Sequence, residues 1–265
     1  MTAKTTSSAS GKFTWKRALH ALMSFIAVLL AATLLTSCGK MLARKEYKRG
    51  LAAFDKENYE TAVNHFSKAA KKGDSGAMLM KGLCLIAGKG CEKNEREGLL
   101  CLRAAADAGN TDALAWCGSV LCHTTHTSKD LKRQGVEYLK KAIDQGCIFA
   151  MHSLGSFYSF GYEYTGDADS EEKCVKYYKM AAEQPLSQSK EKTFWDYYDT
   201  AGESKRLHKK GLYGVNNYIV TSQHDLGVFY EEREDYEEAK KWFKMAGDNG
   251  YPGMKEELEY LDEKE

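Results

Sequence analysis

Two short patterns contain the serine and lysine that a nucleophilic hydrolase could use: Ser170-Glu171-Glu172-Lys173 and Ser187-Gln188-Ser189-Lys190. In enzymes that hydrolyse beta-lactams, the serine of an S-x-x-K pattern attacks the substrate, and S-D-N and K-T-G motifs complete the site. Neither motif follows here. Both patterns stand in charged sequence at expected helix starts, where a serine caps the helix and a lysine is solvated. The sequence therefore predicts no catalytic residue, and an envelope hydrolase stays only as the alternative function.

A second candidate is a metal site at Cys122, His123 and His126. Two histidines three residues apart share one face if they are helical, and both residue types ligate metals. No second pair of ligands stands nearby, and the other histidines of the later chain are scattered. We therefore expect a polar loop here, with no metal and no cofactor.

The N-terminus predicts export. Four basic residues precede an uncharged apolar segment over 21–35, which is the pattern of a signal peptide. Fifteen residues rise on the order of 22 Å as a helix, which is short of the roughly 30 Å hydrocarbon core of a bilayer. An uncleaved signal anchor and cleavage at another small residue remain the alternatives.

The residues Leu35-Thr36-Ser37-Cys38 resemble the lipobox of bacterial lipoproteins. This resemblance implies cleavage between Ser37 and Cys38 and acylation of Cys38. Two or three acyl chains hold a protein stably on a membrane. Gly39 is not the aspartate associated with retention in the inner membrane. We therefore expect a cell-envelope protein, placed in the outer membrane, on its periplasmic or surface face, if the host has one.

The charge balance argues against nucleic acid as a partner. Removing residues 1–37 takes away four basic and no acidic residues, which leaves a net charge of −3. Only two prolines occur in the chain, which suits a mostly helical protein.

Seven cysteines besides Cys38 fall between positions 84 and 174. An oxidising envelope favours disulfides, and an odd number leaves at least one thiol unpaired or paired between chains. No connectivity follows from the spacing. Cys117 and Cys174 are expected to be small buried side chains.

One element recurs along the chain, an alanine with a bulky apolar residue three positions before it. The alanines are Ala69, Ala105, Ala142, Ala181 and Ala246, and their partners are Phe66, Leu102, Leu139, Tyr178 and Phe243. A glycine follows most of them and suits the left-handed residue that ends a helix. A preceding helix carries its own glycine, at Gly50, Gly82, Gly118, Gly155 and Gly227. The pattern predicts repeated helix pairs that pack a glycine against a large residue.

These residues resemble the Sel-one-like repeats (SLR) of the tetratricopeptide superfamily. Residues 150–182 carry its pattern through Ala150, Leu154-Gly155, Tyr158, Gly161, Asp169 and Ala181-Ala182. The resemblance implies an all-α fold, a right-handed solenoid of antiparallel helix pairs. In the end units, Gly50 to Ala62 and Gly227 to Ala239 are each twelve residues apart, which is the tetratricopeptide spacing.

The expected organisation has a signal peptide over 1–37, a lipidated tether over 38–45, a repeat array over 46–251 and an acidic capping helix over 252–265. A polar last helix covers the exposed end of a solenoid. The units are expected over 46–74, 75–110, 111–147, 148–185, 186–219 and 220–251. The fifth is a degenerate helix pair, with helices near 189–200 and 203–212, and an ordered loop is the alternative.

The resemblance also implies a function, a membrane-anchored scaffold that binds a partner protein or peptide on its concave surface. Residues one turn from the repeated glycines are expected to face that surface. They include His152, Ser156, His224 and Glu231.

Overall fold

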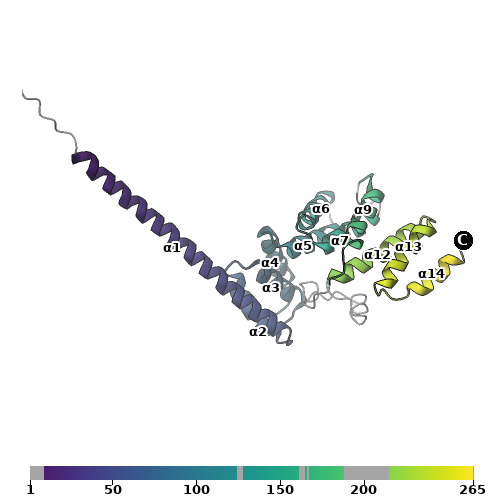
Figure 1. Cartoon of the computed structure of the whole chain (residues 1–265). Coiled ribbons are helices and arrows are strands. Elements are labelled where there is room, and N and C mark those ends of the chain that lie inside the picture. Colours follow the sequence, from purple (N-terminus) through teal and green to yellow (C-terminus); the bar gives the residue numbers. More distant parts are fainter. Residues whose placement is uncertain (1–8, 124–127, 161–164, 166, 188–214, 265) are drawn as a thin grey trace, which may run out of the picture.

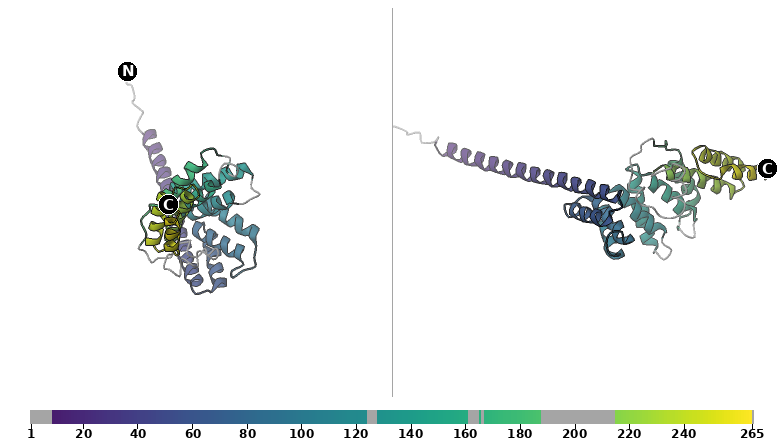
Figure 2. Two further views of the ribbon diagram at one scale, coloured as in Figure 1. Left: turned by 90° about the vertical axis from the view of Figure 1, so that its right-hand side faces the viewer. Right: turned by 90° about the horizontal axis from the view of Figure 1, so that it is seen from below.

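The computed structural model describes residues 9–123, 128–160, 165, 167–187 and 215–264, and every regular element in them is an α-helix (Figure 1). The predicted all-α class is confirmed. A long first helix, α1 (Ala9–Phe54), projects from a stack of shorter helices, as both views in Figure 2 show.

The helices after α1 follow one another as antiparallel pairs. The α1 helix packs its C-terminal part on α2 (Tyr59–Ala70), α3 (Ser75–Ala87) pairs with α4 (Glu95–Asp107), and α5 (Thr111–His123) pairs with α6 (Lys129–Ile143). Next, α7 (Ile148–Ser159) pairs with α9 (Ser170–Ala182), and α12 (Val215–Glu231) pairs with α13 (Tyr236–Asp248). The last helix, α14 (Met254–Asp262), packs on α13. This stack is the predicted helical solenoid.

The repeated glycines allow the two helices of a pair to approach closely. A methyl group added at Gly118 would lie 2.7 Å from Leu139 Cγ, and one added at Gly227 would lie 2.4 Å from the Phe243 ring. Gly50, Gly82 and Gly155 meet Phe66, Leu102 and Tyr178 in the same way. The five alanines that follow these large residues are fully buried. The predicted packing of small against large residues is confirmed in every described pair.

The helix ends also follow the predicted chemistry. Gly73, Gly109, Gly146 and Gly250 have positive φ angles between 79° and 97° and follow the second helices. Several helices begin at a polar cap, such as Asp74, whose carboxylate accepts a hydrogen bond of 2.8 Å from the Ala77 amide. Each cap satisfies a backbone group that the helix itself leaves without a partner.

The two end units share a tight turn between their helices. Glu57 and Glu234 both adopt left-handed backbone angles, with φ of 59° and 60°. The next residues, Asn58 and Asp235, cap the second helices and bond back to the first. The shared spacing of twelve residues thus gives the same turn twice.

The α1 helix continues through the predicted cleavage site without a break, so residues 38–45, expected as a tether, are helical. Its C-terminal turns are the first helix of the first pair, where Ala43 and Gly50 are buried. Among the described residues, no helix has an apolar stretch long enough to cross a membrane.

The helices predicted near 189–200 and 203–212 lie outside the described residues. On either side of this segment, α12 packs directly against α7 and α9. Asn216 joins the flanks, because its side chain accepts a 2.8 Å hydrogen bond from the Ser187 amide and donates one of 3.0 Å to the Ser187 carbonyl. The described stack therefore passes from α9 to α12 without a gap.

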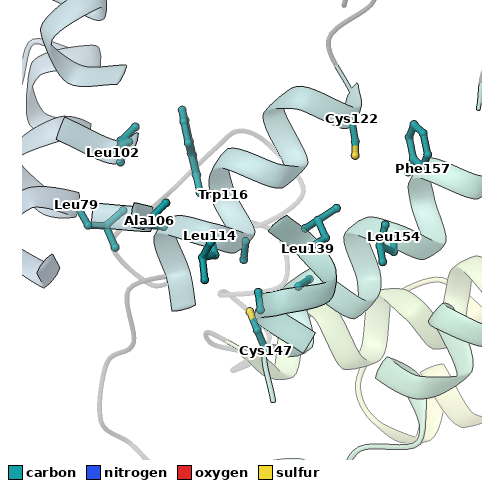
Figure 3. Packing of buried hydrophobic residues seen from close by; sticks show 14 of the residues in the cluster. Leu79, Leu102, Ala106, Leu114, Trp116, Cys122, Leu139, Cys147, Leu154 and Phe157 are labelled. Carbon is teal, nitrogen blue, oxygen red and sulfur yellow. The ribbon is translucent and has the colours of Figure 1, made fainter. Parts of the chain in front are cut away.

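The core runs along the whole stack between first and second helices. Leu102, Leu139 and Leu154 are fully buried, and Trp116 and Phe157 lie among them (Figure 3). One cluster of buried side chains extends from α2 to Trp242 on α13, and a second cluster lies among α12, α13 and α14.

Candidate protein-binding groove

The first helices of three successive units lie side by side, because α7 packs between α5 and α12. A hollow of about 280 Å³ opens on this face. Its walls come from the three helices and consist of Trp116, Ser119, Val120, His123, Phe149, His152, Ser153, Ser156 and Tyr218. We refer to these nine residues as the groove.

Aromatic side chains frame the groove. The rings of Phe149 and Tyr218 meet edge to face, with centroids 4.8 Å apart and planes at 69°. The His152 ring lies 5.7 Å from the Tyr218 ring, and Trp116 on α5 is largely buried at the opposite wall. Such rings offer large apolar surfaces that lose little conformational freedom on binding.

The protonation of His152 follows from its neighbours. Its Nδ1 lies 3.0 Å from Ser222 Oγ, and the Ser222 hydroxyl donates its own proton to the Tyr218 carbonyl at 2.6 Å. Nδ1 is therefore the donor, which leaves Nε2 as an acceptor. Burial lowers the pKa of His152, although Asp225, 3.9 Å away, partly offsets this effect. The ring is neutral at neutral pH.

His123 repeats this arrangement on α5. Its Nδ1 donates to the Ser119 carbonyl at 2.9 Å, so the neutral ring also keeps Nε2 as an acceptor. Burial lowers the pKa of His123 as well. The groove thus combines aromatic walls, serine hydroxyls and two neutral imidazoles, a composition suited to an apolar group that carries hydrogen-bond donors.

The structure brings two of the four predicted binding residues together, since His152 and Ser156 both line the groove. His224 instead stacks on Tyr251 with ring centroids 4.3 Å apart, and its Nδ1 lies 3.3 Å from Asp225. Glu231 is half-buried at the end of α12. Neither His224 nor Glu231 is among the groove residues.

Sequence reasoning missed the aromatic walls and His123 as parts of this surface. The repeat register contained a signal for some of them. Trp116 and Ser153 each stand two residues before a repeated glycine, and Ser119 and Ser156 each stand one after it. Tyr218 had no such signal, because it precedes the predicted unit that begins at residue 220.

The first S-x-x-K pattern does not form a serine–lysine pair. Ser170 is buried at the first position of α9, and its hydroxyl donates to the Asp167 carbonyl. Lys173 Nζ lies 2.5 Å from Asp167 Oδ2, and this hydrogen bond raises the pKa of Lys173. A lysine held in its charged form cannot accept the proton of a serine. Lys190 of the second pattern lies outside the described residues.

The predicted polar loop and the cysteines can be placed in part. Cys122 is buried at the end of α5, and His126 lies outside the described residues. Among the described side chains, no group of three or more potential ligands could hold a metal ion.

All eight cysteines are free thiols. The disulfides expected for an oxidising envelope are therefore not formed, and Cys174 is buried as predicted while Cys117 is half-buried.

Comparison with known proteins supplies the family context. The family model for the Sel1 repeat matches residues 41–74, 75–110, 113–147, 148–186 and 220–251. A Sel1 repeat protein from Oxalobacter formigenes is similar in structure, with a TM-score of 0.55 and 23% sequence identity over 80% of this chain and 73% of that one.

A second solved structure is a protective antigen of uropathogenic Escherichia coli strains with an SLR fold. It has a TM-score of 0.43 and 22% identity, over 78% of this chain and 45% of that one. No curated protein matched the chain significantly.

Proposed function

Because the chain belongs to the Sel1 repeat family, whose members are generally non-enzymatic scaffolds for protein binding, we propose that it is a membrane-anchored scaffold that binds a partner protein in its groove. The groove is the main observation that supports this proposal. It is the place where three first helices meet and where polar and aromatic side chains share a hollow.

The composition of the groove favours a peptide segment as its occupant. A partner side chain with an apolar body and a polar tip would contact the aromatic walls and donate to the imidazole acceptors of His123 and His152. The inner surface of a solenoid also offers contacts along several units, which suits an extended partner.

The anchor is the second part of the proposal. Cys38 is exposed on α1, in the lipobox-like sequence that ends at this residue. Acylation there would place the first repeat directly beside a membrane of the cell envelope. The partner would then be a protein of the same compartment.

Site-specific photocrosslinking in intact cells tests the groove. A photoreactive phenylalanine analogue at Val120 stands in the groove, and one at Leu100 stands on the outer helix α4, where the side chain is 62% exposed. We expect a defined protein adduct from position 120 that is lost when Tyr218→Ala is added. Equal adducts from both positions would contradict binding in the groove.

Mass analysis of the mature N-terminus tests the anchor separately. We expect a chain that begins at Cys38 and carries the added mass of two or three acyl chains. An unmodified Cys38 in a membrane-bound chain would exclude lipid anchoring and leave the groove proposal unaffected.

A further inference from the structure

The C-terminal part of α1 has two different faces. One face is buried against the repeats, with Ala43 and Glu46 at 2% and 8% exposure and the Tyr47 ring 6.0 Å from the Phe66 ring. The opposite face is open and is lined by Lys40, Met41, Arg44, Lys45, Lys48, Arg49 and Ala52. We refer to the five cations among these residues as the basic face.

The basic face is uniformly positive on a chain whose remainder is acidic. Glu46 is the only acidic residue between positions 39 and 54, and its largely buried carboxylate bonds His65 and also pairs with Arg49 at the edge of the basic face. The structure gives Lys40, Arg44, Lys45 and Lys48 no ion-pair partner among the described residues. Without residues 1–37 the chain has a net charge of −3, whereas residues 39–54 carry five basic residues and one acidic residue.

We propose that the basic face binds the anionic phospholipid headgroups of the membrane that holds Cys38, so that α1 lies along the surface and the repeats face the water. The proposal rests on the proposed membrane attachment near Cys38. Clusters of Lys and Arg directly beside a membrane segment are attracted by anionic lipids.

The geometry of α1 favours a flat orientation over an upright one. From Lys40 to Arg49 the helix rises on the order of 14 Å, whereas the Debye length at physiological salt is about 8 Å. An upright helix would hold Lys48 and Arg49 beyond the reach of the headgroup charge. A helix lying on the surface brings all five cations within reach.

A nearby apolar side chain strengthens this contact. Met41 lies between the cations and is 71% exposed, and Leu42 beside it is 44% exposed. In helices that lie at membrane interfaces, apolar side chains enter the boundary between headgroups and acyl chains while Lys and Arg meet the headgroups. The same orientation leaves α2, which packs on the buried face of α1, away from the lipid.

Energy transfer from tryptophan to a dansyl-labelled lipid measures the distance between the repeats and the bilayer. The full-length chain carries Trp15→Phe, so that the remaining donors all follow residue 100. It is reconstituted into vesicles of phosphatidylcholine alone or with about 30% phosphatidylglycerol. Energy transfer is measured at 0.01 M and at 1 M salt, where the Debye length is about 30 Å and about 3 Å.

At 0.01 M salt we expect more transfer in the anionic vesicles, and at 1 M salt no difference between the two lipids. The triple variant Lys40→Gln, Arg44→Gln, Lys48→Gln should lose the difference at low salt. It leaves the pair of Arg49 and Glu46 intact, and circular dichroism checks its helix content. The matched triple variant Lys244→Gln, Lys255→Gln, Lys264→Gln neutralises three exposed lysines of the C-terminal units and should keep the difference.

Equal transfer in the two lipids for the unmodified chain, or an equal loss in both triple variants, would overturn the proposal. This outcome is distinguishable from failure of the lipid anchor. The lipid comparison uses one chain in two lipids, and mass analysis of Cys38 is a separate measurement, so either result can fail without the other.

Discussion

The end units and the middle units use the same glycine position with different neighbours. In the end units, Gly50 and Gly227 lie against the rings of Phe66 and Phe243. In two middle units a second glycine stands opposite, so that an added methyl group at Gly82 or Gly118 would lie 2.9 or 2.8 Å from the carbonyl oxygen of Gly98 or Gly135. A ring can tilt, but a backbone cannot move without its helix. These two middle pairs therefore tolerate an added side chain less well than the end pairs do.

Cysteines separate the two regions further, because all seven that follow Cys38 lie in the middle units. Burial raises the pKa of Cys84, Cys122, Cys147 and Cys174 to about 12, from an ordinary value of 9.0. At pH 8 the thiolate fraction of these residues is thus lower by about 1000-fold. We expect timed alkylation with N-ethylmaleimide, read by peptide mass spectrometry, to modify the more accessible Cys91 before these four buried cysteines.

In urea all seven thiols should react at similar rates, which provides the control. Alkylation of Cys122 as fast as that of Cys91 in the folded chain would contradict the burial of Cys122.

Alanine substitutions test the packing directly. Gly118→Ala meets backbone atoms and should lower the free energy of unfolding by about 3 kcal/mol, as overpacking of a core does. Gly227→Ala meets the Phe243 ring and should cost about half as much. Urea unfolding of the full-length chain in mild detergent, followed by circular dichroism, measures both.

Gly39→Ala is the matched control, because an added methyl group there meets no atom within 4 Å. It should be neutral or slightly stabilising, since alanine favours the helix. A larger loss for Gly227→Ala than for Gly118→Ala would reverse the comparison.

Glycine substitutions in the tight turns of the end units should stabilise the protein. Glu57 and Glu234 hold left-handed backbone angles that cost a residue with a side chain roughly 1–2 kcal/mol. Glu57→Gly and Glu234→Gly should each raise the free energy of unfolding by about 1 kcal/mol, since glycine adopts these angles freely but loses more entropy on folding. The neighbouring Lys56→Gly, where the backbone angle is ordinary, should be destabilising instead.

The smallest predicted effect is a pH dependence of stability that has opposite signs at the two ends of the array. A hydrogen bond with His65 and one with Arg49 lower the pKa of Glu46. At the other end, burial and the negative charges of Glu257 and Glu232 raise the pKa of Glu231. A lowered carboxyl pKa stabilises the fold above the unfolded value near 4.5 and loses this effect as the pH falls. A raised pKa has the opposite sign, because the folded chain then binds the proton more tightly.

Acidification from pH 6 to pH 4 should therefore weaken the first unit and strengthen the last. Amide hydrogen exchange, compared between α2 and α13, measures the two ends in one sample. Glu46→Gln should remove the pH dependence at α2 only, and Glu231→Gln that at α13 only. The same direction of change at both ends would contradict the assignment.

The sequence predicted the helix pairs well because their determinants are local. A glycine opposite a large residue and a glycine after the second helix, such as Gly155 with Tyr178 or Gly146, act through sterics that a repeat displays directly. The predicted class and family are confirmed for the same reason. The continuity of α1 was not foreseen, because processing signals direct attention to residue 38 and not to the helix-forming residues after it.

The groove could not be derived from the repeat alone. It requires Tyr218 beside Phe149 and Ser222 beside His152, residues that are about 70 positions apart. Their meeting depends on the packing of α12 against α7, which brings together residues on either side of the segment 188–214. The free cysteines were missed because the expected compartment, rather than the geometry of the thiols, guided the expectation of disulfides.

The two hydrogen bonds between Asn216 and Ser187 have a consequence for how such an array can change over time. They fix the flanks of residues 188–214 at one spacing, whatever stands between them. Lengthening a connection costs little free energy once its ends are fixed, about 0.6 kcal/mol for each doubling. Natural selection or a protein engineer can therefore exchange this segment for one of another length without shifting the register of the helices on either side.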